Sequence, residues 1–167
     1  MEADLVTLSA AIGTAASAGS SRAQVLIATA ESCTGGWAAQ VITHTGGSSA
    51  WFERGFVTYS NKAKIEMLGV RPETLAQFGA VSPETAAEMA AGALKNSNAM
   101  FSLAITGIAG PTGGSPGKPV GTVCFAWCRA GEAPDAETAV FAGDREAVRR
   151  QAVLHALRGL LKRLDAA

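Results

Sequence analysis

Short apolar runs alternate along this chain with segments in which apolar residues recur every three or four positions. The runs have the length and continuity of buried strands and lie at 25–30, 55–59, 101–105, 120–127 and 135–141. The helical pattern covers 5–19, 37–42, 62–68, 71–78, 81–95 and 145–164. This alternation predicts an α/β fold, and the Gly- and Pro-containing segment 129–134 predicts a hairpin between the last two strands.

The residues at several predicted helix ends are those that favour caps. Ser60 or Asn61 is a suitable N-cap for the helix 62–68, and Gly69 follows it in the position where helices commonly end. Pro72 and Pro83 lie at early positions of two further helices. In the first segment, the helical pattern is expected to end near Gly19.

Length and charge restrict the class of protein. The 167 residues suffice for one compact domain, 1–167, and 14 basic residues balance 14 acidic ones, so neither nucleic acid nor an anionic membrane surface is indicated as a partner. The first residues lack a basic leader, and no apolar run approaches the roughly 20 residues needed to cross a bilayer. Three cysteines without a Cys-x-x-Cys pair indicate reduced thiols. We therefore expect a soluble, cytoplasmic protein.

The turn after the first predicted strand, Glu31–Gly36, has the composition of an anion-binding loop. Small polar residues and glycines between a strand and a helix leave backbone N–H groups and the helix dipole directed at one place, where the hydroxyls of Ser32 and Thr34 can assist. The alternative is an ordinary capped helix start. Cys33 in this turn is either a nucleophile or, as we favour, a buried structural residue.

The segment 46–64 brings a hydroxyl, a phenol and an amine together within a short stretch of sequence. It begins as a Gly/Ser turn, continues as a strand and places Lys64 near the first turn of a helix. To act as a base, a lysine must lower its pKa from about 10.4 to about 7–8. The helix dipole contributes only about 0.3–1 kcal/mol, so burial or a second cation would have to supply most of this change. The alternative is that Lys62 and Lys64 are solvated surface residues.

Two other segments carry candidate binding residues. The segment 106–119 is too rich in Gly and Pro for regular structure, which favours a binding loop with Thr106 facing the ligand. Arg145, Arg149 and Arg150 begin the last helix, where cations are unfavourable unless an anion faces them. The two interpretations are a solvated basic face and an arginine that holds a phosphate or carboxylate.

Six short motifs occur in order along nearly the whole chain: Ala30–Gly36, Gly47–Phe52, Gly55–Asn61, Gly79–Ser82, Thr106–Pro111 and Lys118–Val123. Together they resemble the CinA C-terminal domain family, whose enzymatic members are nicotinamide-nucleotide amidohydrolases. The resemblance implies a three-layer α/β/α sandwich with a central mixed sheet. It also implies hydrolysis of the carboxamide of nicotinamide mononucleotide to nicotinic acid mononucleotide and ammonia, in pyridine-nucleotide salvage, without a metal or other cofactor.

The same resemblance assigns roles to individual residues. Ser49 would be the nucleophile, Lys64 its general base and Tyr59 a positioning residue, and backbone N–H groups of the turn Gly46–Ser49 would stabilise the oxyanion. Which of Ser48 and Ser49 attacks is left open. The expected substrate contacts are Ser32, Thr34, Gly47, Ser48, Thr106, Gly107 and Arg145.

Two other classes of function stay open at this point. One is a nucleotide-binding module without catalysis. The other is a phosphate-ester or thiol hydrolase that uses Cys33. The partner expected in the first case, and in the amidohydrolase, is a small molecule. The apolar composition also favours a homo-oligomer.

Overall fold

Five strands form one mixed sheet in the order β2-β1-β3-β4-β5. The structure, a computed structural model, describes residues 1–18 and 24–167. Strand β1 pairs in parallel with β2 and β3, whereas the pairs β3/β4 and β4/β5 are antiparallel. The strands are β1 (Ile27–Glu31), β2 (Phe52–Val57), β3 (Phe101–Gly107), β4 (Thr122–Arg129) and β5 (Asp135–Val140). The expected mixed sheet and the hairpin are therefore confirmed.

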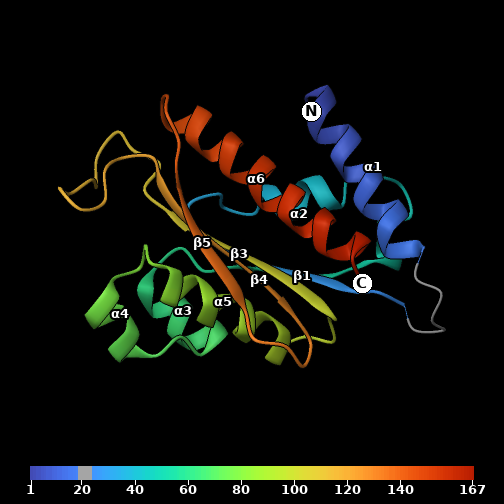
Figure 1. The fold of residues 1–167 in the computed structure, drawn as a ribbon, viewed down its shortest axis with the longest axis horizontal. Coiled ribbons are helices and arrows are strands. Elements are labelled where there is room, and N and C mark those ends of the chain that lie inside the picture. Colours follow the sequence, from blue (N-terminus) through green and yellow to red (C-terminus); the bar gives the residue numbers. More distant parts are fainter. Residues whose placement is uncertain (19–23) are drawn as a thin grey trace.

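Helices cover both faces of this sheet, which makes the molecule a three-layer α/β/α sandwich (Figure 1). One face carries α1 (Ala3–Ser17), α2 (Trp37–Ile42) and α6 (Arg145–Asp165). The other carries α3 (Asn61–Leu68), α4 (Pro72–Phe78) and α5 (Pro83–Lys95). The predicted layers are confirmed, while the expected helix end at Gly19 lies outside the described residues. None of the helices that the structure describes is long and apolar enough to cross a membrane.

Small residues let the second helical layer approach the sheet closely. Ala28, Ala30, Ala104 and Ala126 of the sheet pack with alanines of α5 in one buried cluster. Helix α3 packs on α5 at Gly92, where an added Cβ would lie 1.9 Å from the carbonyl oxygen of Leu68. This contact fixes the position of α3, the helix that carries Lys64.

Strand β2 begins earlier than the apolar run indicated. The prediction placed it at 55–59, whereas the ladder runs from Phe52 to Val57. The parallel ladder with β1 starts at Phe52, next to the hydrogen bond that Ile27 N–H donates to the Trp51 carbonyl. Tyr59 lies beyond the ladder because the chain turns there toward the N-cap of α3, which is Ser60.

Candidate active site

Three neighbouring parallel strands end at the same edge of the sheet. Glu31, the last residue of β1, pairs with Val57 of β2 and with Ile105 of β3. From this edge α2 continues on one face of the sheet, while α3 continues on the opposite face. Connections that diverge to opposite faces leave a crevice at the carboxyl ends of the strands, where α/β proteins bind ligands.

Lys64 lies at this edge of the sheet and is buried, which is rare for a lysine. Its side chain is only 1% exposed, and its Nζ donates hydrogen bonds of 3.1 Å to Ser32 Oγ and of 3.1 Å to the Thr58 carbonyl. Within the described residues, no carboxylate forms an ion pair with it. Burial therefore lowers the pKa of Lys64, although proximity to Cys33 opposes this effect.

The same helix contains the solvated lysine that the alternative interpretation required. The Lys62 side chain is 82% exposed and pairs with Glu66 one turn along the helix. The difference follows from the position of each residue on α3, since only Lys64 faces the sheet. The expectation that burial would have to activate Lys64 agrees with its position.

Ser32 begins a tight turn that joins β1 to α2. Its N–H donates to the Ile105 carbonyl, and its own carbonyl accepts from Gly35 N–H at 3.0 Å. Gly35 and Gly36 have φ angles of 60° and 98°, which only glycine adopts readily. In the described part of the chain, the N–H groups of Thr34 and Gly36 have no hydrogen-bond acceptor. The turn therefore presents a hydroxyl together with unpaired backbone donors.

Cys33 lies in this turn but is not a reactive thiol. It is buried, and burial raises its pKa to about 11. A cysteine nucleophile needs a lowered pKa, so the geometry argues against a thiol hydrolase. The interpretation of Cys33 as a structural residue agrees with this environment.

Arg145 connects two of the loops around the crevice. Its guanidinium donates 2.9 Å to the hydroxyl of Tyr59, which is 60% exposed, and 2.8 Å to the Gly110 carbonyl. It also lines a recess of about 380 Å³ with Trp37, Asp144, Glu146 and Arg149. Tyr59 and Arg145 therefore meet at the rim of the crevice, far apart in sequence but close in the fold.

The other two arginines in the first turns of α6 have structural partners. Arg149 donates 3.0 Å to the Cys33 carbonyl and 3.2 Å to the Thr34 carbonyl. Arg150 forms ion pairs with Glu2 and Asp4 at the start of α1. Of the three, Arg145 is the one whose position favours a ligand contact.

Three of the expected substrate contacts have structural roles: the hydroxyls of Thr34 and Thr106 donate hydrogen bonds within the protein, and Gly107 lies in a close strand pairing. The Thr34 side chain is fully buried and donates 2.7 Å to Glu31, so we revise its expected role from substrate contact to structural contact. Thr106 is 1% exposed and donates 2.8 Å to the Ala80 carbonyl, which holds the start of α5 near the crevice. At Gly107, an added Cβ would lie 2.8 Å from Val123, so glycine permits close pairing of β3 with β4.

Ser49 lies at the opposite end of the sheet from Lys64. The short 3-10 helix Ser48–Ala50 precedes β2, whereas Lys64 follows it. The six residues of β2 span about 20 Å at roughly 3.3 Å per residue. The expected Ser49–Lys64 pair is therefore not formed within one chain, and the turn Gly46–Ser49 cannot supply oxyanion donors to the crevice in the same chain.

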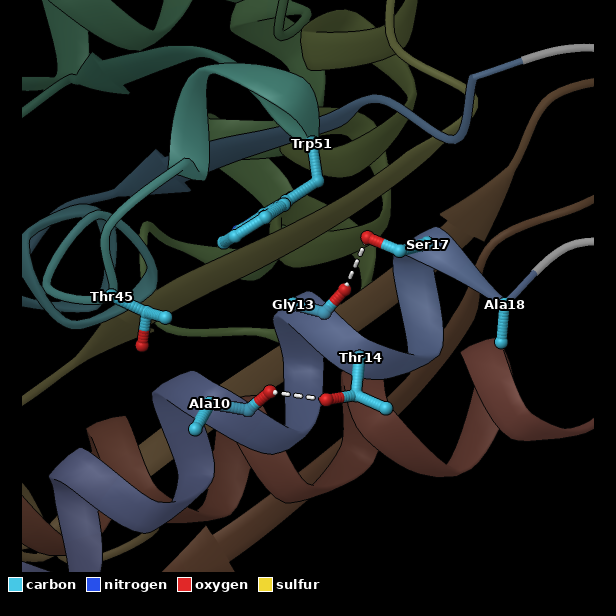
Figure 2. A pocket seen from close by; sticks show the side chains of 7 residues that line it. All are labelled: Ala10, Gly13, Thr14, Ser17, Ala18, Thr45 and Trp51. Atoms are coloured by element: carbon cyan, nitrogen blue, oxygen red, sulfur yellow. Dashed lines mark hydrogen bonds between the residues drawn. The ribbon is translucent and has the colours of Figure 1, made fainter.

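The surroundings of this second turn are shown in Figure 2, where Trp51 and Thr45 face the small residues of α1. A Cβ at Gly13 would lie 2.8 Å from the Trp51 ring, so glycine allows this approach. Gly47 adopts a φ of 87° against the same ring, and Ser48 is half-buried with its hydroxyl 3.4 Å from the Thr43 carbonyl. Gly13, Thr45 and Trp51 line a recess of about 550 Å³ on the α1 side. Gly47, against the Trp51 ring, lies beside this recess and not at the crevice.

Sequence reasoning identified Ser32 only as a substrate contact and assigned no role to Glu31. The contact between Ser32 and Lys64 could not be predicted from their spacing in the sequence, because the contact depends on the pairing of β1 with β2. Glu31 is fully buried, which its position at the end of an apolar run could have indicated. Within the described residues, no group of three or more His, Cys, Asp or Glu side chains could hold a metal ion.

The fold and the crevice define a class of single-domain α/β/α proteins in which a buried lysine contacts a serine at the carboxyl edge of the sheet. The sequence profile of the CinA C-terminal domain matches residues 10–164, and the chain belongs to this family.

Close relatives span nearly the same length. The chain is 55% identical to nicotinamide-nucleotide amidohydrolase PncC of Escherichia coli strain K12, an alignment that covers 95% of this chain and 94% of that protein. It is also 55% identical to the protein of the same name from Pseudomonas putida, over 81% of this chain and 84% of the relative. The crystal structure of competence/damage inducible protein CihA from Agrobacterium tumefaciens superposes with a TM-score of 0.90 at 43% identity, covering 97% and 96% of the two chains.

Proposed function

We propose that this protein hydrolyses the carboxamide of nicotinamide mononucleotide to nicotinic acid mononucleotide and ammonia. The names of relatives that are 55% identical over almost the full chain support this substrate. The observation that carries the proposal is the 3.1 Å contact between Lys64 Nζ and Ser32 Oγ in a buried crevice. It places a hydroxyl beside an amine whose pKa is lowered by burial.

In the proposed reaction, Ser32 and not Ser49 is the nucleophile. Neutral Lys64 accepts the hydroxyl proton as Ser32 Oγ attacks the carboxamide carbon, forming a tetrahedral intermediate. The unpaired N–H groups of Thr34 and Gly36 are the candidate donors to its oxyanion. Protonated Lys64 then donates its proton to the departing amine, which leaves as ammonia.

Hydrolysis of the resulting ester completes the cycle. Water attacks the acyl carbon while Lys64 accepts a proton, and Ser32 leaves with a proton returned by the lysine. The Thr58 carbonyl, 3.1 Å from Nζ, keeps the amine in place during both steps. Because this pair supplies base and acid in turn, we propose that the reaction does not require a metal.

Arg145 is the proposed contact for the substrate phosphate. It lies at the rim of the crevice in the first turn of α6, and its partners Tyr59 and Gly110 are neutral acceptors. A phosphate would be a stronger acceptor for the guanidinium than either of them. Tyr59 would then orient Arg145 through its hydroxyl. A cytoplasmic location, a role in pyridine-nucleotide salvage and a homo-oligomeric state stay predictions.

The test is ammonia release from nicotinamide mononucleotide by the purified protein after treatment with EDTA. We expect turnover in the wild type and its loss in Ser32→Ala and Lys64→Met, with binding of the nucleotide retained in Ser32→Ala. A folded wild type that binds the nucleotide without turnover would instead identify a non-catalytic binding module. Turnover that EDTA abolishes and a divalent metal restores would overturn the metal-free reaction.

A further inference from the structure

Glu31 is a completely buried carboxylate next to Ser32. One oxygen accepts from the Thr34 hydroxyl at 2.7 Å and from Ala38 N–H at 2.8 Å, and the other accepts from Ala39 N–H at 3.1 Å. None of these partners is a basic group. Burying a carboxylate is costly unless hydrogen bonds replace its hydration, so the three donors account for its presence.

This carboxylate replaces the cap that α2 cannot provide locally. The N-cap residue is Gly36, which has no side chain and adopts a left-handed φ of 98°. Ala38 and Ala39 are the second and third residues of α2, whose N–H groups an N-cap side chain normally satisfies. Because Glu31 caps the helix from the strand, the turn is free to use the glycine conformations that place Ser32 beside Lys64 and leave the N–H groups of Thr34 and Gly36 unpaired.

A second charged residue holds the turn from the opposite side. The guanidinium of Arg149 donates to the carbonyls of Cys33 and Thr34 and lies 5.6 Å from the centre of the Trp37 ring. Glu31 therefore accepts hydrogen bonds from the Thr34 hydroxyl and from two N–H groups of α2, whereas Arg149 donates to two carbonyls of the turn. Thr34 contacts both, through its hydroxyl and its carbonyl.

The turn is also connected to the base. The carbonyl of Glu31 accepts from Thr58 N–H at 2.8 Å, and the carbonyl of Thr58 accepts from Lys64 Nζ. Glu31 thus holds the Ser32 turn through its side chain and, through its backbone carbonyl, holds Thr58, whose carbonyl binds Lys64.

We propose that Glu31 and Arg149 are positioning residues that set the distance between Ser32 Oγ and Lys64 and the direction of the backbone N–H groups. The inference rests on the proposed function, since the geometry they hold is that of the nucleophile and its base. They act through Ser32 and the turn, not by touching the substrate. A displacement of about 1 Å at a reacting group can reduce the rate about 100-fold, so removal of either residue should lower kcat more than it raises KM.

The first test is Glu31→Gln, which keeps the size of the side chain but turns one acceptor into a donor that faces an N–H group. We expect kcat for nicotinamide mononucleotide to fall about 10- to 100-fold while KM changes less than about threefold. The matched control is Glu88→Gln. Glu88 likewise accepts a backbone N–H, from Arg71, and a threonine hydroxyl, from Thr74, but on the face of α4 and α5. Its replacement should leave kcat within about twofold of the wild type.

The second test is Arg149→Lys, which keeps the charge but loses the two-pronged contact with the turn carbonyls. We expect a decrease in kcat of about tenfold with little change in KM. The control is Arg150→Lys on the same helix, whose partners Glu2 and Asp4 lie away from the turn. A kcat in both Glu31→Gln and Arg149→Lys that matches the two controls would overturn the proposal.

A third pair keeps the inference testable if Glu31→Gln does not fold. Thr34→Val removes the hydroxyl that donates to Glu31, and Thr34→Ser retains it. A loss of kcat in the valine variant that the serine variant restores, at equal melting temperature, supports positioning. Equal kcat in the two variants contradicts it. Failure of the proposed function would give a different result. In that case neither the wild type nor Ser32→Ala would release ammonia from nicotinamide mononucleotide.

Discussion

The two ends of the parallel strands carry turns of similar composition and different character. At the carboxyl end, the turn Ser32–Gly36 lies over a buried lysine and is held by Glu31 and Arg149. At the amino end, the turn Gly46–Ser49 is largely exposed, and Gly47 lies next to the Trp51 ring, which packs against α1. Glycine and serine make a turn possible at either end, but only the first turn lies over a buried amine that can take part in its chemistry.

The path of the chain explains why the two turns are separated. Helix α2 returns the chain to the amino end of the sheet, and β2 then runs in parallel with β1 toward the carboxyl end. A residue before β2 and a residue after it therefore lie a strand length apart. Ser32, more distant from Lys64 in sequence than Ser49 is, becomes its neighbour because β1 and β2 pair in parallel.

The largest difference between the two turns is expected when the hydroxyls of Ser32 and Ser49 are removed in separate variants. Ser32→Ala should reduce kcat for nicotinamide mononucleotide by about 10⁴-fold or more, because no other hydroxyl is hydrogen-bonded to Lys64 in the described residues. Ser49→Ala should lower it less than about threefold. Steady-state ammonia release measures both. The reverse order of effects would show that the amino-end turn reaches an active site, which within one chain the fold does not permit.

The second prediction concerns the base. Lys64→Met should lower kcat about 10²- to 10⁴-fold, because methionine has no amine to accept the Ser32 proton. In the wild type, the rate should rise with pH as Lys64 loses its proton. The midpoint should lie below the ordinary lysine pKa of 10.5, because burial lowers the pKa of Lys64. A pH–rate profile measures this, and a rising limb centred at 10.5 or above would contradict it.

The same burial makes a prediction about stability. The pKa of Lys64 is lower in the folded state than in the unfolded state, so the unfolded state binds more protons between the two values. The free energy of unfolding should therefore gain a contribution that grows as pH rises from the folded-state pKa toward 10.5. Urea unfolding of the wild type and Lys64→Met at several pH values isolates this contribution, because the variant cannot show it. A pH-independent difference between the two proteins would be evidence against the buried amine.

A smaller effect is expected at the rim. Arg145→Lys should raise KM about tenfold, because the ammonium cannot bind a phosphate in two places at once. Tyr59→Phe should act through Arg145, so the double variant should show a coupling of about 0.5–1 kcal/mol in kcat/KM. Additive effects of the two substitutions would indicate that the observed hydrogen bond has no influence on substrate binding.

The smallest effect is expected at the cysteine beside Ser32. Cys33→Ala should keep kcat within about threefold of the wild type, because burial raises the pKa of the thiol to about 11 and leaves it protonated at neutral pH. Rapid inactivation of the wild type by iodoacetamide, absent in Cys33→Ala, would be inconsistent with a buried thiol.

Much of the fold could be predicted from local patterns. The apolar runs located the strands within a few residues, and Ser60, one of the two predicted N-cap residues, caps α3 in the structure. Where the prediction was displaced, at β2, the cause was the register with β1, which begins at Phe52 before the apolar run starts. Local propensity does not contain that register.

The candidate site divides in the same way. Residue types alone singled out Lys64, Tyr59 and the turn at Ser32, because hydroxyls, an amine and glycines beside strand ends suit nucleophilic chemistry. The resemblance to the CinA C-terminal domain family implied Ser49 as the partner of Lys64, but the fold separates the two residues. The burial of Lys64 and Glu31, and the contacts of Arg145 and Arg149 with distant loops, depend on which strands and helices are neighbours. The sequence by itself determined the chemical groups and the elements that carry them. Only the tertiary structure decided which groups meet and which lose their water, because both follow from the packing of segments far apart in the chain.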